Sequence, residues 1–409
     1  MDTVRGDRAG ATTEKRPGGR SREMNTMKRA RMILTALAVS AVVVAAAPRA
    51  CRAIVVDLKG ETSAAQPSQP ASGPGGAVYP HADIKMSQHG SGNDMFWIFE
   101  PADPAPESAP VIAFFHGWSA MHPKMYGGWI SHLARRGSIV IFPKYQENVN
   151  VMPPVMHKAA MDAVAAALVE LQKPGRVKPD LERFAAVGHS FGGVLASNLT
   201  ANWSKLAMPR VRAAMPVEPG DPKYAHIAKM VHHKPLESIM ADYADIHPGT
   251  LFAVVVGADD GIVAERTAAE IYRAATSLPA EHKNYIVFHS DRHGDPALAA
   301  DHMLPIATDQ SFDIPERRLA AEPVAGIIRD RLERMARDGE QEPEERDVYA
   351  ANVHDFALWR LFDSLTDCAF YGKNCDGALG DSDKVTRVGE WSDGVQIKKL
   401  EIREPSGGQ

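Results

Sequence analysis

The chain has 409 residues, of which 44% are hydrophobic and 24% charged, a composition typical of globular proteins with one or two domains. Its formal net charge of -5 favours no particular partner, and no basic face with interleaved aromatic residues stands out, so the sequence gives no support to nucleic-acid binding. It also lacks the Cys/His spacing of a zinc site and any internal repeat, so we expect no metal, no cofactor and no solenoid.

The N-terminal segment 27–53, MKRARMILTALAVSAVVVAAAPRACRA, resembles a secretory signal peptide. Three basic side chains precede an apolar run from Met32 to Ala47, which is the order of charges and apolar residues in such signals. The run is short for a bilayer span, so we expect no stable membrane span after cleavage, and a membrane-anchoring helix is the alternative. The sequence therefore predicts a secreted or periplasmic protein.

The cleavage site has two candidates. Cleavage after Ala53 leaves small residues where a signal peptidase reads them, whereas cleavage before Cys51 indicates a lipoprotein. Pro48 and Arg49 disfavour the lipoprotein, because they occupy positions where that signal has an aliphatic and a small residue. Residues 1–23 are polar and unpatterned, and we expect translation to begin at Met24 or Met27.

Residues 54–77 are rich in Pro, Gly, Ser and Ala, which predicts a flexible linker without a core of its own. We therefore expect the folded domain to cover residues 78–409.

Within that domain, apolar runs typical of strands alternate with longer helical patterns. The runs are DMFWIFEP, PVIAFFHG, GSIVIFPKY, RFAAVGHS, AAMPVEPG, LFAVVVGADD and NYIVFHSD. A helical pattern at 156–173, MHKAAMDAVAAALVELQK, is typical of a helix that packs on a sheet. The alternation predicts an α/β fold with a mainly parallel sheet and helices on both faces. Functional side chains are then expected at the carboxyl ends of the strands.

Ser190 lies in the turn between the strand RFAAV and the helical segment GGVLASNL. The surrounding GHSFGG has the Gly-x-Ser-x-Gly pattern of a sharp strand-to-helix turn, in which glycines allow a strained backbone and a close approach of the helix. Such a turn exposes the hydroxyl above the sheet, beside a helix N-terminus that favours developing negative charge. Ser190 is therefore the candidate nucleophile.

A serine nucleophile needs a base, and the base needs a group that orients it. Asp260 follows the strand LFAVVVG, and His293 follows the strand NYIVF, so serine, acid and histidine occur in the order expected on this sheet. His293 is the preferred base because it follows its strand after a loop of ordinary length. His302 and His289 are the alternatives for the base.

For the acid, Asp259 and Glu218 remain open as alternatives to Asp260. Asp259 directly precedes it, and Glu218 follows the strand before. Each of these carboxylates is also compatible with an ordinary surface or capping role in a turn.

Residues 78–302, together with a helix near 352–367, resemble an α/β-hydrolase of the secreted esterase branch that includes dienelactone-hydrolase-like, chlorophyllase-like and polyester-hydrolase-like enzymes. GHSFGG matches the nucleophile turn of that superfamily, FFHGW its strand-end His-Gly, and GADDGIV its acid turn. The resemblance implies an α/β-hydrolase fold and an oxyanion hole formed by the main-chain N–H groups of Trp118 and Phe191. It also implies that His116 and Gly117 have a structural part in that loop. The motif around the histidine departs from the usual Gly-x-x-His.

Two features follow the last predicted strand of the core. Residues 312–347 are densely charged and predict a helical insertion, with a lid over the site as the alternative. Residues 368–409 form a cysteine loop and a tail that is expected to add a terminal strand. Removal of Cys51 with the signal leaves Cys368 and Cys375, for which an oxidising compartment predicts a disulfide.

The sequence therefore predicts a secreted serine hydrolase that cleaves carboxylic esters through an acyl-enzyme. A peptidase or amidase with the same triad and a non-catalytic binding module on this scaffold are the alternatives. The expected substrate is a small-molecule, lipid or polymer ester. Several apolar side chains after the oxyanion strand suggest an acyl site or a part of the core: Trp118, Met121, Tyr126 and Trp129.

Overall fold

A computed structural model describes residues 59–148, 150–224, 236–312 and 350–406, which belong to one compact unit, Val56–Gln409. The predicted signal peptide and nearly all of the predicted insertion 312–347, including its alternative role as a lid, lie outside these residues. None of the helices in the described part of the chain is both long enough and apolar enough to span a bilayer.

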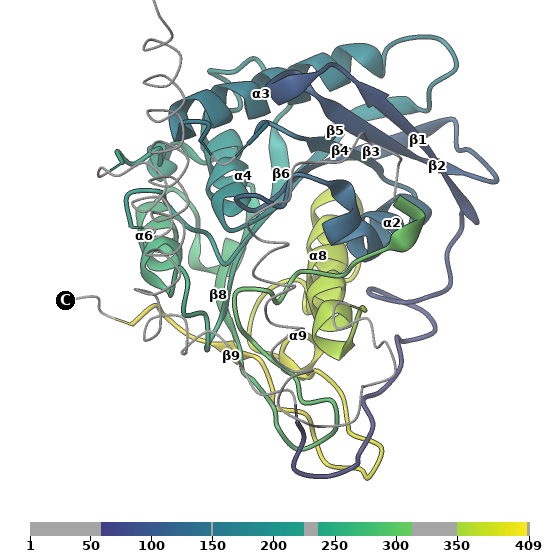
Figure 1. Cartoon of the computed structure of the whole chain (residues 1–409), viewed down its shortest axis with the longest axis vertical. Coiled ribbons are helices and arrows are strands. Elements are labelled where there is room, and N and C mark those ends of the chain that lie inside the picture. Colours follow the sequence, from purple (N-terminus) through teal and green to yellow (C-terminus); the bar gives the residue numbers. More distant parts are fainter. Residues whose placement is uncertain (1–58, 149, 225–235, 313–349, 407–409) are drawn as a thin grey trace, which may run out of the picture. The chain divides into compact units, whose positions relative to one another are not determined.

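A nine-stranded, mostly parallel sheet forms the centre of this unit (Figure 1). Its strands are β1 (Asp83–His89), β2 (Phe96–Ala102), β3 (Ser108–Phe115), β4 (Ile139–Pro143), β5 (Lys178–His189), β6 (Val211–Val217), β7 (Leu251–Gly257), β8 (Lys283–Phe288) and β9 (Glu401–Ile402). They follow the order β1-β2-β4-β3-β5-β6-β7-β8-β9, in which β3 to β8 run parallel. The strands β1, β2 and β9 pair antiparallel at the two edges.

The α-helices cover both faces of the sheet, as the alternating sequence pattern predicts. They are α2 (Gly127–Arg135), α3 (Pro153–Glu170), α4 (Phe191–Asn202), α6 (Arg266–Ala274), α8 (Val353–Tyr371) and the short α9 (Asp383–Thr386). One hydrophobic core lies between the sheet and α3, α4 and α6, and the other lies between the sheet and α2 and α8. Successive residues of β3 alternate between these cores, because side chains of a strand point to opposite faces. The α/β-hydrolase fold is therefore confirmed.

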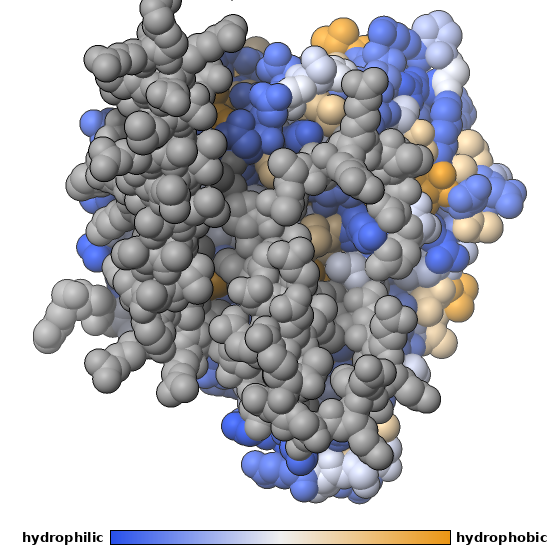
Figure 2. Space-filling view, viewed as in Figure 1, coloured by the Kyte–Doolittle hydropathy of each residue, from blue (hydrophilic) through white to orange (hydrophobic). Residues whose placement is uncertain are grey.

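Residues 59–77, the described part of the predicted linker 54–77, make main-chain hydrogen bonds to the rest of the unit. This segment, which we call the strap, lies against the C-terminal tail and the loop after β8 (Figure 1). The N–H of Thr62 donates to the His293 carbonyl at 2.8 Å, and the N–H of Ser392 donates to the Ala65 carbonyl at 3.0 Å. A segment without apolar periodicity is thus fixed by main-chain hydrogen bonds, which composition does not reveal. The end of the unit where strap and tail meet is mostly hydrophilic (Figure 2).

The C-terminal segment contains the expected helix, disulfide and terminal strand. Helix α8 begins with a capping box at Asn352 and ends at Gly372, whose φ of 63° is the left-handed conformation of a helix C-cap. The disulfide Cys368–Cys375 is confirmed and ties the last turn of α8 to the segment that follows it. The tail then returns to the sheet, where β9 pairs with β8.

Candidate active site

Ser190 occupies the turn between β5 and α4, where the backbone is strained. Its φ of 56° and ψ of -122° are unusual for a residue with a Cβ. Hydrogen bonds to neighbouring strand ends hold this conformation, since its N–H donates to Val217 and its carbonyl accepts from Gly220. At Gly192, a Cβ would lie 2.3 Å from the Phe115 carbonyl oxygen, so only glycine lets α4 begin this close to β3. The turn predicted from GHSFGG is therefore present.

A chain of two hydrogen bonds joins Ser190 to His302 and Asp260. The distance from Ser190 Oγ to His302 Nε2 is 2.9 Å, and that from His302 Nδ1 to Asp260 Oδ2 is 2.8 Å. All three residues are buried. The hydroxyl lies beside the N-terminus of α4, where the helix dipole stabilises negative charge. This arrangement can remove a proton from the serine and stabilise the resulting imidazolium.

The electrostatics of Asp260 suit the orienting role. Burial by itself raises the pKa of this carboxyl, whereas the charge of His302 and its hydrogen bond lower it. Two main-chain donors, the N–H groups of Ile262 and Val263, add hydrogen bonds to Oδ1 at 2.9 and 3.0 Å. The pKa of Asp260 is therefore below its ordinary value, and the carboxylate is ionised when His302 takes up a proton.

The structure does not bring His293, the preferred candidate for the base, to Ser190; the histidine that contacts the serine hydroxyl is the alternative, His302. His293 Nε2 lies 2.7 Å from Asp393 Oδ2 in the tail, and a quarter of its side chain is exposed. The carbonyl of His293 accepts hydrogen bonds from Thr62 in the strap. His293 is thus part of the contact between the loop and the strap.

The reason lies in the path of the loop after β8. Asp291 and Leu298 form an antiparallel bridge, so the residues between them form a loop whose two ends lie side by side. His293 lies within this loop, and His302 follows the loop in the chain. The sequence Gly-Asp-Pro directly after His293 is a turn signal that indicates such a loop.

The two alternative acids differ in their surroundings. Asp259 is exposed, and no described contact joins its side chain to His302. Glu218 is fully buried, with Oε2 at 3.9 Å from His302 Nδ1 and 3.5 Å from His189 Nε2. Burial, reinforced by the charges of Asp260 and Asp301, raises the pKa of Glu218 well above its ordinary value. Asp260, at 2.8 Å, is the acid that contacts His302 directly.

The two residues expected to form the oxyanion hole lie close together. The rings of Trp118 and Phe191 meet edge to face, with centroids 5.8 Å apart. Trp118 follows the end of β3 and Phe191 follows Ser190 at the start of α4. The two residues therefore lie beside each other where β3 and β5 end.

The apolar residues considered for an acyl site differ in burial. Trp129 is a core residue of α2 that packs edge to face on Phe114 and Phe362. Tyr126 and Met121 are also buried, whereas Trp118 is partly exposed. Trp118 is therefore the member of this group that can contact a substrate.

The ligand atoms of His189, Glu218 and His302 lie within 4.8 Å of one another, close enough to hold a metal ion. However, His189 Nε2 already hydrogen-bonds the His302 carbonyl, and His302 Nδ1 already bonds Asp260. The donor set is thus engaged in the hydrogen-bond network, and we assign no metal to it.

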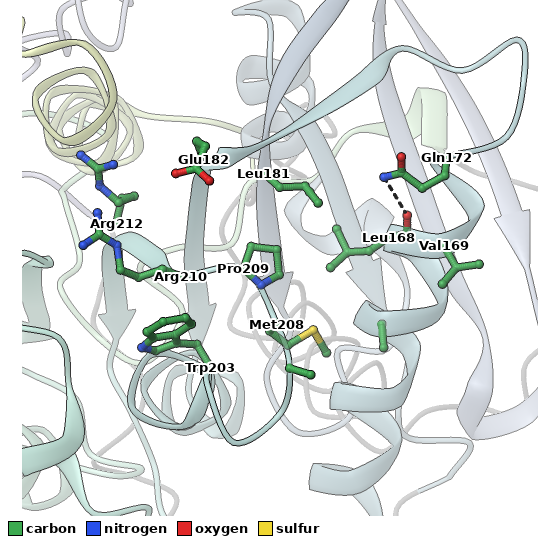
Figure 3. A pocket seen from close by; sticks show the side chains of 12 residues that line it. Leu168, Val169, Gln172, Leu181, Glu182, Trp203, Met208, Pro209, Arg210 and Arg212 are labelled. Atoms are coloured by element: carbon green, nitrogen blue, oxygen red, sulfur yellow. Dashed lines mark hydrogen bonds between the residues drawn. The ribbon is translucent and has the colours of Figure 1, made fainter.

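A cavity of about 720 Å³ lies at the other end of the sheet (Figure 3). Its walls are the end of α3, the starts of β5 and β6, and the segment after α4, including Leu168, Leu181, Trp203 and Arg212. Leu181 precedes His189 by eight residues of β5, a rise of about 26 Å. The cavity is therefore remote from Ser190.

Residues 79–235 match the family model described as Chlorophyllase. A sequence search finds no curated protein with significant similarity to the chain. The matched segment includes Trp118, Ser190 and Phe191, while Asp260 and His302 lie beyond it. Together with the order of the strands, the match shows that the chain has the α/β-hydrolase fold and is similar, over residues 79–235, to the chlorophyllase family of ester hydrolases.

Proposed function

We propose that the protein is an exported serine esterase that cleaves carboxylic esters through an acyl-enzyme at Ser190. The observation that carries the proposal is the hydrogen-bond chain from Asp260 through His302 to Ser190, with distances of 2.8 and 2.9 Å. A complete chain of nucleophile, base and orienting acid favours catalysis over a binding module on this scaffold.

In the proposed reaction, Ser190 Oγ attacks the ester carbonyl while His302 Nε2 takes the hydroxyl proton. Asp260 holds the imidazole in the tautomer that leaves Nε2 free to accept, and it stabilises the imidazolium that forms. The main-chain N–H groups of Trp118 and Phe191 donate to the oxygen of the tetrahedral intermediate, each at about 3 kcal/mol. His302 then protonates the leaving alcohol, and a water molecule activated by the same base releases the acid.

Export is part of the proposal. The signal-like segment 27–53 and the disulfide Cys368–Cys375 support it, because disulfides persist mainly in oxidising compartments. Intact-mass analysis of the mature protein from its native host tests this part. A mass that retains residues 27–53 would contradict the cleaved signal.

The test of the activity is hydrolysis of p-nitrophenyl esters of rising chain length, with an aminoacyl anilide beside them. Ser190→Ala is expected to abolish ester cleavage and labelling by a fluorophosphonate, because the substitution removes the attacking hydroxyl. Ser197→Ala is the matched control, since this buried serine of α4 donates only to the Gly193 carbonyl within its helix. Faster cleavage of the anilide would replace the esterase by an amidase, and activity in Ser190→Ala would refute the proposed nucleophile.

A further inference from the structure

Two of the buried polar side chains that have no part in the proposed reaction are His189 and Tyr126. His189 is the last residue of β5, and Tyr126 ends the short helical turn Pro123–Tyr126 that precedes α2. His189 is 4% exposed and Tyr126 is completely buried. Neither touches the reacting hydroxyl in a described contact, yet both hydrogen-bond the segments that carry the proposed catalytic groups.

These contacts form a chain of hydrogen bonds in which the donor and the acceptor of each bond can be assigned. His189 Nε2 lies 2.9 Å from the main-chain carbonyl oxygen of His302, which can only accept, so Nε2 carries the proton. Burial, together with the charge of His302, lowers the pKa of His189 well below its ordinary value, so the ring is neutral. Its Nδ1 is then an acceptor, and the Tyr126 hydroxyl donates to it at 2.9 Å. The Tyr126 oxygen in turn accepts from the Gly117 N–H at 2.8 Å.

The chain, which we call the His189 bridge, joins two segments that have no regular structure of their own. One end is the carbonyl of His302, which follows β8 after a loop of irregular backbone. The other end is the N–H of Gly117, and the next peptide along carries the N–H of Trp118, the proposed oxyanion donor. His189, the middle of the bridge, directly precedes Ser190 in the chain.

The packing around the bridge leaves it little freedom. A Cβ at Gly117 would lie 2.9 Å from His189 Nδ1 and 3.3 Å from the Tyr126 hydroxyl, so glycine is required for the approach. The rings of His189 and His302 lie 4.8 Å apart, and two positive charges at that distance would repel. A neutral donor therefore suits the site when His302 takes up a proton during the reaction.

We propose that His189 and Tyr126 are positioning residues that hold the base His302 and the oxyanion peptide at Trp118 in fixed relation to Ser190. The inference rests on the proposed function, because it assigns a role within the same site. It predicts that a substitution in the bridge lowers kcat and leaves KM nearly unchanged, since the bridge orients groups that act in the transition state.

Steady-state kinetics on the best p-nitrophenyl ester, with thermal midpoints measured in parallel, test this role. His189→Leu is expected to lower kcat about 100-fold, the scale of a misplacement near 1 Å, with KM within about twofold. His189→Gln is expected to recover most of the rate, because its amide can donate to the His302 carbonyl. Tyr126→Phe is expected to lower kcat about 10-fold, and to add little to the effect of His189→Leu, because both substitutions cut the same chain.

His132→Leu is the matched control for a buried histidine that makes two hydrogen bonds. His132 is 1% exposed and contacts Tyr79 and Asp363, with no described contact to the bridge. Its substitution is expected to lower the thermal midpoint without lowering kcat per folded molecule. Equal kcat in His189→Leu and the parent protein, or a loss that His189→Gln does not relieve, would overturn the positioning role.

A second measurement tests the hydrogen bonds of the His189 bridge independently of the proposed esterase activity. Failure of the parent protein on every ester would contradict the esterase but leave the bridge testable. In the ¹H–¹⁵N spectrum, the bridge predicts a slowly exchanging ring proton on Nε2 of His189, absent in His189→Leu and shifted in Tyr126→Phe. A His189 ring protonated at Nδ1 would overturn the bridge, whatever the activity.

Discussion

Replacement of His302 and of His293 in separate variants tests which of these two histidines is the base. His302 Nε2 lies 2.9 Å from the Ser190 hydroxyl, whereas His293 contacts Asp393 and the strap. Only one of them is placed to take the proton of the nucleophile.

The expected loss follows from the role of a base that acts with the nucleophile as a unit. Removal of such a histidine costs about 10⁴- to 10⁶-fold in kcat, or about 5 to 8 kcal/mol of transition-state stabilisation at 1.36 kcal/mol for each factor of ten. His302→Asn is preferred to His302→Ala, because its amide can still donate to Asp260 and spare the buried carboxylate the loss of its partner. The asparagine cannot act as a base.

The assay is kcat on a p-nitrophenyl ester, together with the rate at which a fluorophosphonate labels Ser190. His293→Ala is expected to leave both rates within about twofold, because its charged partner is on the surface and its hydrogen bonds to Thr62 use the main chain. A His302→Asn variant with kcat within about tenfold of the parent protein would refute the assignment, as would a large loss in His293→Ala.

Three further predictions concern stability. Ser190→Gly is expected to be more stable than Ser190→Ala by about 1 kcal/mol in urea unfolding, because glycine relieves the strain of a φ of 56° at some entropic cost; an equal or lower midpoint would contradict the strain. Replacement of both Cys368 and Cys375 by serine is expected to lower the free energy of unfolding by about 2.5 kcal/mol, from closure of a loop with a sequence separation of 7, and an unchanged midpoint would count against the disulfide. Burial lowers the pKa of both His116 and His354 to about 4, so the unfolded chain binds protons that the folded chain excludes as the pH falls from about 6.5 towards 4. Stability should therefore be present above pH 6.5 and fall across that window, by on the order of 3 kcal/mol for each histidine, and a urea midpoint that rises on acidification would exclude this account.

Much of the fold could be predicted because the central strands are buried on both faces. The strands β2 to β8 contain short apolar runs that were predicted to within a few residues, but the polar first residues of β5, Lys178–Glu182, were not predicted. The edge strand β1, DIKMSQH, could not be predicted, because none of its side chains is fully buried and its composition is that of a loop. The position of the strap could not be predicted for a related reason. Main-chain hydrogen bonds hold the strap in place, and such bonds leave no pattern of side chains in the sequence.

The parts of the site that depend on local sequence were also predictable. The Ser190 turn needs glycines at fixed offsets, and Asp260 follows its strand by three residues, so each position is set within a few residues of a strand end. The role of His189 could not be predicted, although His189 lies within the same motif. The proposed positioning role of His189 depends on hydrogen bonds to Tyr126 and to the His302 carbonyl, and both residues are distant from His189 in sequence.

The sequence by itself determined the central strands of the sheet, the serine turn and the order of serine, acid and histidine, because these follow from hydrophobic periodicity and from glycines at a turn. Only the tertiary structure decided which histidine meets the serine. The loop after β8 has no periodicity, and its course is set by the Asp291–Leu298 bridge, by the hydrogen bond from Asp259 N–H to the Ala300 carbonyl, and by the strap. Distance along such a loop carries no information about distance in space, so His302, nine residues beyond His293, is the one that returns to Ser190.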